Sequence, residues 1–475
     1  MKKLLTASYV LFIILLPFQL FPFLTSFKLF FSTNASINNC FFVLMIGLLL
    51  LIMQMRGVIR FRGSLTVVAL RLPILLVLLS LFTSAVLLPV LGELYGKNAL
   101  SASFSKSVYY LLITLTFYYN AYLFEYLTAD RIARILNFLC WFNLLIGAFQ
   151  LLMIYVIPTL GSIYDALDFF NILEDSSYLI YYKRVCLTCS EPSIMGMSVG
   201  VLLLPYAMAQ FLHQRRNLKY LFFIVALTAI SFFSFSSSVY ITIVMNYLVF
   251  LFFLFKGSQS AYILIFIFTG LVVILSAFSF GLLDDSYIGD QLSFLLLEKT
   301  TDMNNLSTGY RFTTVINDIA CFLRYPLSGI GNGNQGFLYN ETMLSSMVSD
   351  SVRVNYQTVA AMDGKLGLIS GGAFVPSFIS GYGIIGVLLL SDFVIRCVRT
   401  VRRKREEMGY LFEYYCIGAL SYLAMGTVAI SIEGNFMALF VLGLPLSVDQ
   451  FREKRLDGKA VLGQVRPKPS LRNSI

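Results

Sequence analysis

Charged residues are scarce in this sequence: Asp, Glu, Lys and Arg together make up 13% of its 475 residues. Soluble domains typically contain about a quarter charged residues. Hydrophobic residues instead make up 58% of the chain, which is more apolar surface than a soluble fold of this size can bury. This composition excludes an ordinary soluble protein and predicts an integral membrane protein whose solvent is mainly lipid.

The sequence also lacks the groups that several common chemistries require. Its only histidine is His213. It contains no Walker A phosphate loop, and no Asp-x-Asp pair of the kind that holds a metal on a nucleotide sugar. Cys186-Leu-Thr-Cys189 has no second C-x-x-C, and the other cysteines are scattered, so neither a zinc site nor a disulfide framework is favoured. We therefore expect no metal and no cofactor.

Long apolar runs dominate what is present. The pattern predicts an all-α polytopic membrane protein with about twelve transmembrane helices. Pro17, Pro22 and bulky Phe residues stand where a signal peptide needs small residues, so the first run is expected to remain as a helix. The runs lie at 7–26, 38–55, 70–91, 107–124, 136–157, 193–212, 220–235, 239–255, 261–282, 373–395, 409–427 and 429–447.

The basic residues predict the orientation of the chain. With the N-terminus in the cytoplasm, most of the 35 Lys and Arg residues fall in cytoplasmic segments, as the positive-inside rule requires. The C-terminal tail is also basic, and we expect it to contact anionic lipids rather than nucleic acid. The resulting parts are nine transmembrane helices over 1–282 with an outer loop at 158–192, a large outer loop at 283–372, three transmembrane helices over 373–447, and the cytoplasmic tail at 448–475.

The large outer loop contains an amphipathic pattern. Apolar residues recur at helical spacing over 311–323, which predicts a short helix lying on the outer membrane surface. Ser307 or Thr308 can cap its start, and Pro326 ends it. Its polar face, which we expect to point toward a site at the level of the lipid head groups, carries Arg311, Thr314 and Asp318.

Three alternate glycines follow this helix, at Gly329, Gly331 and Gly333. A turn of this kind can expose several backbone amides toward an anion, although a plain loop has the same pattern. The functional interpretation depends on the neighbouring Arg311 and Arg324, because Arg is the side chain best suited to bind phosphate through two hydrogen bonds.

The shorter outer loop ends with Lys183-Arg184 and then Glu191-Pro192, directly before an apolar run. Pro192 suits the first turn of the following helix, and a carboxylate at Glu191 suits its N-terminus. Glu191 is therefore either a helix-capping residue or a positioned acid or base beside Arg184. Glu433, at the edge of the last run, is either a functional carboxylate within the membrane or part of a short outer turn.

These segments resemble those of the family of O-antigen polymerases and O-antigen ligases. Arg184 and Glu191-Pro192-Ser193 are similar to that family's Arg…(Glu/Asn)-Pro-(Asn/Ser) segment. Gly309-Tyr-Arg311 and Tyr325-Pro326-Leu-Ser-Gly329-Ile-Gly331-Asn-Gly333 resemble its Gly-Arg…Pro-Leu-x-Gly-Val-Gly-x-Gly segment, and Gly381-Tyr-Gly383-Ile-Ile-Gly386 resembles its Gly-(Leu/Ile)-Ile-Gly segment. The resemblance covers residues 184–390.

The resemblance implies a metal-independent glycosyl transfer at the outer face of a bacterial cytoplasmic membrane. It implies polyprenyl-pyrophosphate-linked oligosaccharides as substrates, membrane lipids as surroundings, and a protein that regulates chain length as a partner. Glu191 would be the general base, with Asp318 and Glu433 as substitutes. The other expected site residues are Arg184 and Arg311, which bind pyrophosphate with Arg324 or Arg353, and the substrate contacts Lys183, Gly329 and Gly331.

Two departures bear on the branch of the family. Ser236-Ser237-Ser238 stands where the family often has Ser-Arg-Gly, and the stretch before the apolar run at 373 lacks the histidine that ligases carry there. The second departure favours a polymerase over a ligase. A lipid-linked oligosaccharide flippase or transporter and a structural membrane protein remain as alternatives. The first would place polar residues deep in several spans, and the second would not gather the loop arginines in one cleft.

Overall fold

A computed structural model describes residues 2–18, 37–57, 64–94, 97–167, 175–189, 192–214, 217–255, 306–338, 373–427 and 436–450, and the described chain is almost entirely helical. The longer helices are α1 (Lys2–Leu15), α2 (Ile37–Met55), α3 (Ser64–Leu91), α4 (Ala99–Ala121), α6 (Ala129–Tyr155), α10 (Leu204–His213), α11 (Leu218–Phe232), α12 (Ser237–Phe255), α16 (Leu306–Arg324), α19 (Phe374–Arg403), α21 (Tyr410–Gly426) and α22 (Phe436–Gln450).

Shorter elements connect these helices. They are α5 (Leu123–Tyr126), α7 (Gly161–Leu167), α8 (Ser176–Tyr182), α9 (Pro192–Met197), α20 (Arg405–Met408), the strand pair β1 (Glu93–Leu94) and β2 (Lys97–Asn98), 3₁₀ turns at Pro158–Leu160 and Gln335–Leu338, and a π-helical turn at Ser198–Leu203. The outer loop predicted at 158–192 therefore contains α7 and α8, and α9 begins at Pro192 as expected.

Four helices within the described residues are long and apolar enough to cross a membrane. They are Ser64–Leu91, Ala129–Tyr155, Ile194–His213 and Phe374–Arg403, and shorter apolar helices lie at Lys3–Leu15, Met45–Met55, Leu218–Phe232, Ser238–Leu254 and Phe436–Gln450. Every predicted apolar run overlaps a helix except 261–282, which lies outside the described residues. A count of twelve spans stays a prediction.

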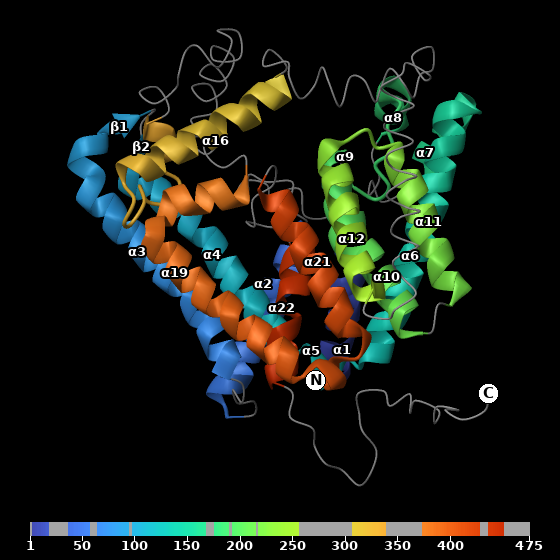
Figure 1. Ribbon diagram of the computed structural model, residues 1–475, viewed down its shortest axis with the longest axis horizontal. Helices are drawn as coiled ribbons and strands as arrows, with labels where there is room; N and C mark the ends of the chain where they lie inside the picture. Colours follow the sequence, from blue (N-terminus) through green and yellow to red (C-terminus); the bar gives the residue numbers. More distant parts are fainter. Residues whose placement is uncertain are drawn as a thin grey trace.

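The helices form two groups on either side of a central pair. Figure 1 shows α3, α4 and α19 on one side, α6, α7 and α11 on the other, and α21 and α22 between them. The span made of α9, the π turn and α10 is 94% buried and packs against α12 and α21. This span is enclosed by protein, whereas α3 is only 22% buried and presents most of its apolar surface outward.

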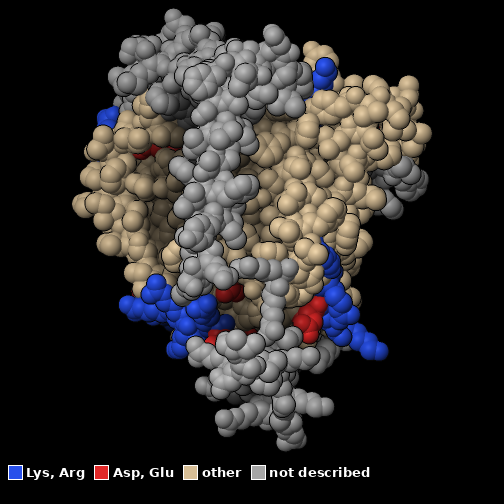
Figure 2. Space-filling view, turned by 45° about the vertical axis from the view of Figure 1, so that its right-hand side comes forward, with Lys and Arg blue, Asp and Glu red and all other residues tan. Residues whose placement is uncertain are grey.

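Basic side chains gather at one end of the molecule. The cluster from Arg396 to Arg405 lies at the end of α19, and Figure 2 shows Lys and Arg side chains gathered at that lower end. Some of these cations pair with acids nearby: Arg405 lies 3.7 Å from Glu413, and Arg403 lies 3.7 Å from Asp449. The loop elements α8 and α16 lie at the other end (Figure 1).

α19 contains a sharp break at Gly383, with φ 59° and ψ −161°, a conformation that essentially only glycine adopts. The break divides a short helical segment, 374–382, from the long helix 384–403. It leaves the amides of Ile384 and Ile385 without helical acceptors, and they donate instead to the carbonyl oxygens of Pro326 and Leu327. The break is therefore filled by the loop that follows α16.

Candidate functional site

The loop helix α16 is longer than predicted, and its polar face is buried against the protein rather than open to a site. It begins at Leu306, so Ser307 and Thr308 lie inside it rather than at its cap, and it ends two residues before Pro326 as expected. Its polar residues Thr314, Asn317 and Asp318 are buried against the protein, whereas Ile319 and Leu323 are 51% and 73% exposed. The apolar face is thus directed outward, as suits a helix in contact with lipid.

Asp318 is the centre of a buried polar junction between α16 and the first segment of α19. Its carboxylate oxygens accept hydrogen bonds from the hydroxyls of Ser380, at 2.8 Å, and Ser377, at 3.1 Å. The side chain is 1% exposed, and this burial raises the pKa of Asp318 to about 7, although the two serine hydrogen bonds act in the opposite direction. An enclosed carboxylate with these partners holds α16 in place and is closed to a substrate hydroxyl.

Gln335 completes the junction. Its side-chain amide nitrogen donates to the carbonyl oxygen of Ser377 and to the hydroxyl of Ser380, each at 3.2 Å. Its backbone oxygen accepts a hydrogen bond from the side chain of Asn317 at 3.0 Å. Sequence reasoning missed Gln335 and the two serines. The one available signal is the spacing of Ser377 and Ser380, which places them on one face of a helix.

The glycine turn has no free amides to offer an anion, because each amide from Gly329 to Asn334 already donates within the protein. The expected substrate-binding role of Gly329 and Gly331 therefore gives way to a packing role. The amide of Gly329 donates to the carbonyl oxygen of Tyr325, that of Ile330 to the carbonyl oxygen of Ser380 at 2.9 Å, and that of Gly331 to the carbonyl oxygen of Gly381 at 3.0 Å. The amide of Asn332 donates to the hydroxyl of Ser80 at 2.8 Å, and that of Gly333 to the side-chain oxygen of Gln335 at 3.1 Å. The amide of Asn334 donates to the carbonyl oxygen of Gly331 at 3.1 Å.

Close backbone packing explains why glycines stand here. Gly329 has φ +70°, and a Cβ atom at this position would lie 2.5 Å from the carbonyl oxygen of Ser380. A Cβ atom at Gly383 would lie 2.5 Å from the amide nitrogen of Gly329. The turn and the break of α19 therefore interlock through backbone atoms, with no room for side chains between them.

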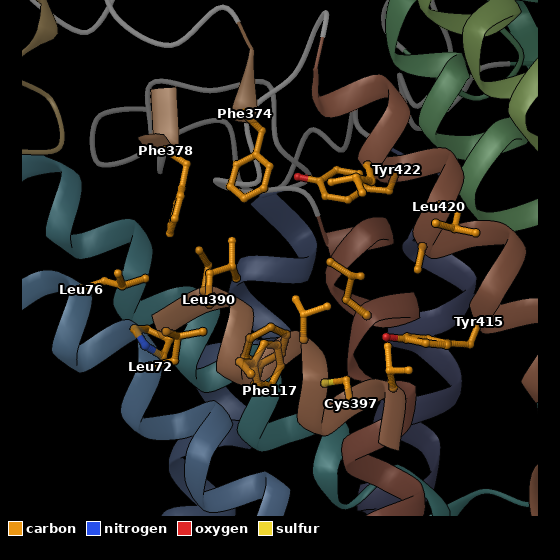
Figure 3. A pocket seen from close by; sticks show the side chains of 18 of the residues that line it. Leu72, Leu76, Phe117, Phe374, Phe378, Leu390, Cys397, Tyr415, Leu420 and Tyr422 are labelled. Atoms are coloured by element: carbon orange, nitrogen blue, oxygen red, sulfur yellow. The ribbon is translucent and has the colours of Figure 1, made fainter. Parts of the chain in front are cut away.

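An apolar cavity of about 320 Å³ lies beside this junction, between α3, α4, α19, α21 and α22. Figure 3 shows Phe374, Phe378 and Tyr422 at one end of the cavity, and Cys397 and Tyr415 toward the other. The rings of Phe374 and Tyr422 lie 6.1 Å apart and connect α19 to α21 across that end. The lining is almost wholly hydrocarbon, which suits a lipid chain.

The first segment of α19 joins the cavity to the polar junction. Phe378 lines the cavity, whereas Ser377 and Ser380 on the same segment contact Asp318 and Gln335. The apolar cavity therefore ends at a segment whose other side is polar and contacts α16. The cavity thus suits the hydrocarbon tail of a lipid, whereas the polar side of the segment is already occupied by Asp318 and Gln335.

Arg184 lies in a second cluster, at the end of α8. The side chain is partly buried, and its Nε atom is buried without a hydrogen-bond acceptor among the described residues. Its charge acts on the hydroxyl of Tyr240 in α12. An Arg that is partly removed from water and has no carboxylate partner in the part of the chain that the structure describes is suited to bind an external anion.

The segment that carries Arg184 is held firmly. The side-chain oxygen of Gln150 accepts from the amides of Cys186, at 3.2 Å, and Leu187, at 2.9 Å, and the amide of Val185 donates to the carbonyl oxygen of Phe233 at 3.0 Å. Within the described residues, the three non-glycine residues with positive φ all lie at this place, namely Lys183, Leu187 and Phe235. Such strain persists only where surrounding contacts fix the backbone.

The predicted site residues thus fall into separate groups. Asp318, Gly329 and Gly331 meet at the α16–α19 junction, and Lys183 and Arg184 lie together at α8, on the other side of Figure 1. Arg324 is exposed at the end of α16, with its guanidinium 5.9 Å from the ring of Tyr325. The remaining residues are not described: Glu191, Arg353 and Glu433 lie outside the described residues, as does the side chain of Arg311.

Comparison with models of known protein families finds no match to this chain, and comparison with curated proteins finds none either. In the part of the chain that the structure describes, no three His, Cys, Asp or Glu residues form a group that could hold a metal ion.

Proposed function

We propose that this protein is a membrane glycosyltransferase that polymerises polyprenyl-pyrophosphate-linked oligosaccharide repeats into an O-antigen or capsule-type polysaccharide. The observation that carries the proposal is the apolar cavity. One end of it is formed by the first segment of α19, and the same segment binds α16 through Ser380 and Asp318. A polyprenyl tail fits an apolar cavity, and its pyrophosphate and sugars would then emerge at the polar loops.

The proposed reaction joins two such substrates. A hydroxyl oxygen of the incoming repeat attacks the anomeric carbon of the growing chain, and the bond from that carbon to the pyrophosphate oxygen breaks. The hydroxyl proton passes to a carboxylate, and the lipid pyrophosphate leaves with the bonding electrons. Arg184, with Arg311 or Arg353, stabilises the developing negative charge, whereas Arg324, at the end of α16 and apart from Arg184, is no longer assigned to it.

The structure changes the choice of base. Asp318 is enclosed and already bonded to two serines, so the role expected of it as a substitute base is withdrawn. Glu191 and Glu433 keep their proposed roles. Glu191 precedes the first residue of α9, and Arg184 lies seven positions earlier on the strained segment, which supports a shared site for the two side chains.

We place the protein in the bacterial cytoplasmic membrane with about twelve spans, both termini in the cytoplasm and the two loops outside. The basic residues that close α19 lie at the end of the molecule away from α8 and α16, which agrees with the positive-inside rule.

Two alternatives are less well supported. A flippase for lipid-linked oligosaccharides needs a polar route for its sugars, whereas the cavity between α19 and α21 is apolar. A ligase would attach the finished glycan to another acceptor, and the stretch before α19 lacks the histidine that ligases carry.

The decisive experiment is reconstitution. The purified protein in lipid nanodiscs should convert a lipid-linked repeat into a ladder of products without added metal or nucleotide. Arg184→Ala and Glu191→Ala should each lower the rate by about 10²-fold or more, because each removes a group that acts in the transition state. Arg399→Ala, at the opposite end, is the control. A single transfer to a different acceptor would identify a ligase, and no transfer by a folded protein would refute the proposal.

A further inference from the structure

α8 presents a group of tyrosines at the outer end of the molecule, next to Arg184. Tyr181 is 79% exposed and Tyr182 is 48% exposed. The ring of Tyr182 lies 4.9 Å from that of Tyr181 in an edge-to-face arrangement and 4.6 Å from that of Tyr178. These rings form a continuous aromatic surface, which we call the α8 tyrosine surface.

The tyrosine surface is rigid although α8 has only seven residues, a length at which an isolated helix is unstable. Asp175 caps its first turn through the amide of Ser177 at 2.7 Å. Asp165 of α7 accepts from the amide and the hydroxyl of Ser176, at 3.0 and 2.6 Å. Exposed rings that are fixed in this way are pre-organised for binding.

The other end of α8 is held as well. The amides of Lys183 and Arg184 both donate to the carbonyl oxygen of Leu179, which is buried. The hydroxyl of Tyr155 donates to the carbonyl oxygen of Lys183 at 2.8 Å. The backbone that carries Arg184 is therefore fixed at the C-terminal end of α8, directly after the tyrosines.

We propose that the α8 tyrosine surface binds the saccharide part of the substrate, with Arg184 at its edge taking an anionic group of the same ligand. The proposal rests on the proposed function, because the saccharide would belong to the lipid-linked chain. Aromatic faces pack against the C–H faces of sugar rings, and tyrosine hydroxyls exchange hydrogen bonds with sugar hydroxyls. A flat saccharide suits a surface that is aromatic but has polar edges.

A lipid head group suits this surface less well. Asp175 and Asp165 lie at the N-terminal end of α8, opposite Tyr181, Tyr182 and Arg184, and hydrogen bonds from Ser177 lower the pKa of Asp175, so its carboxylate is charged at neutral pH. Negative charge there repels anionic phospholipids and accepts hydrogen bonds from sugar hydroxyls.

A tryptophan reporter allows binding to be measured directly. The protein has one tryptophan, Trp141, so a Trp141→Phe, Tyr181→Trp variant carries its only indole on the tyrosine surface. The first probe is the oligosaccharide released by mild acid from the polyprenyl lipids of the producing cells. The second probe is phosphatidylglycerol vesicles without sugar. We expect saturable quenching or enhancement of the indole fluorescence by the oligosaccharide and none by the vesicles.

Substitutions then separate stacking from a general surface effect. Calorimetry can measure oligosaccharide binding to the protein without the tryptophan reporter. Binding should weaken about tenfold in a Tyr181→Ala, Tyr182→Ala variant, because two ring contacts are lost. The corresponding Phe variants keep both rings and lose only the hydroxyls, so they should bind more tightly than the double Ala variant. Phe82→Ala, on the exposed face of α3, is the control and should change nothing.

Two outcomes would overturn the inference: unchanged oligosaccharide binding in the double Ala variant, or a response to vesicles alone, which would assign the tyrosines to the membrane interface. Both are distinguishable from failure of the proposed function. Binding at α8 without a product ladder would support the saccharide site and refute the polymerase, whereas a ladder with unchanged binding would do the reverse.

Discussion

At the scale of single residues, Asp318 shows how burial can turn an expected chemical group into a structural one. Its place on a polar helical face suggested contact with substrate. The structure instead buries that face, and the carboxylate binds Ser377 and Ser380. The sequence identifies the polar face but not its direction, because an apolar face can point either into the protein or toward lipid. Here Ile319 and Leu323 face outward, as suits contact with lipid.

Replacing Asp318 should alter the pH dependence of stability. Burial raises the pKa of Asp318 from 3.8 to about 7, so the protonated form is favoured in the folded protein. Its contribution is fully present below 3.8 and is lost as the pH rises through about 7. The apparent melting temperature of the parent should therefore fall between about pH 4 and about pH 7, and this fall should be shallower in Asp318→Asn. Equal slopes in a thermal-shift assay would contradict the assignment.

Comparison of Gly329 with Gly57 separates the cost of a strained backbone conformation from the cost of a steric clash between a Cβ atom and its neighbours. Gly329 and Gly57 share a φ of +70°, but a Cβ atom at Gly57 meets nothing within 4 Å. Gly57→Ala should cost about 1–2 kcal/mol from strain alone. Gly329→Ala should cost more, because its Cβ also meets the backbone of α19. Melting temperatures of the two variants in detergent test this, and equal losses would argue against the interlock.

At the scale of elements, the junction of α16, the glycine turn and α19 acts as one rigid unit. Short sequence patterns predicted the helix, the turn and the following span, but not their mutual contacts. Ser380 and Asp318 are separated by 62 residues, and no local pattern states which hydroxyl meets which carboxylate. The same limit applies to Gln335, whose role appears only when three segments meet.

A disulfide across the junction tests its rigidity. A Cβ atom at Gly381 would lie 3.6 Å from the Cβ atom of Asn332, within the range that disulfides require. The Asn332→Cys, Gly381→Cys variant should cross-link on oxidation, melt at a higher temperature and keep its product ladder. Gly381→Cys alone is the control. Loss of the ladder on oxidation, with recovery after reduction, would show that the junction opens during turnover.

At the scale of the whole molecule, composition identified the class, and the apolar runs located the helices. The cavity could not be foreseen, because its walls come from two stretches far apart in the chain, α3 and α4 on one hand and α19, α21 and α22 on the other. The separation of Arg184 from the α16–α19 junction could not be foreseen either, because spacing along the sequence does not determine the distance between packed helices.

The orientation can be tested with cysteines placed at opposite ends. Tyr181→Cys lies on α8, and Arg399→Cys lies near the end of α19, where both positions are exposed. A membrane-impermeant maleimide should label the first in intact spheroplasts and the second only after permeabilisation. The cysteines within the described residues are mostly buried, which limits background. The opposite pattern would invert the topology.

Filling the cavity should impair use of the lipid substrate. Ala419→Phe adds a ring to the cavity wall on α21. The rate with a polyprenyl-linked repeat at low concentration should fall about tenfold, the effect of losing two buried methylene groups. Val225→Phe, on the 58% exposed face of α11, is the control. Unchanged activity in Ala419→Phe would show that the tail binds elsewhere.

The glycine turn has a consequence for how the protein is made. The amide of Asn332 bonds to Ser80, 252 residues earlier, while its neighbours bond to Ser380 and Gly381, which are synthesised later. During membrane insertion the turn can meet α3 as soon as it emerges, but it cannot close until α19 has followed it. The loop can therefore reach its final packing only late in biogenesis, after α19 has been synthesised. In a chain truncated before α19, the loop should be cleaved by added protease.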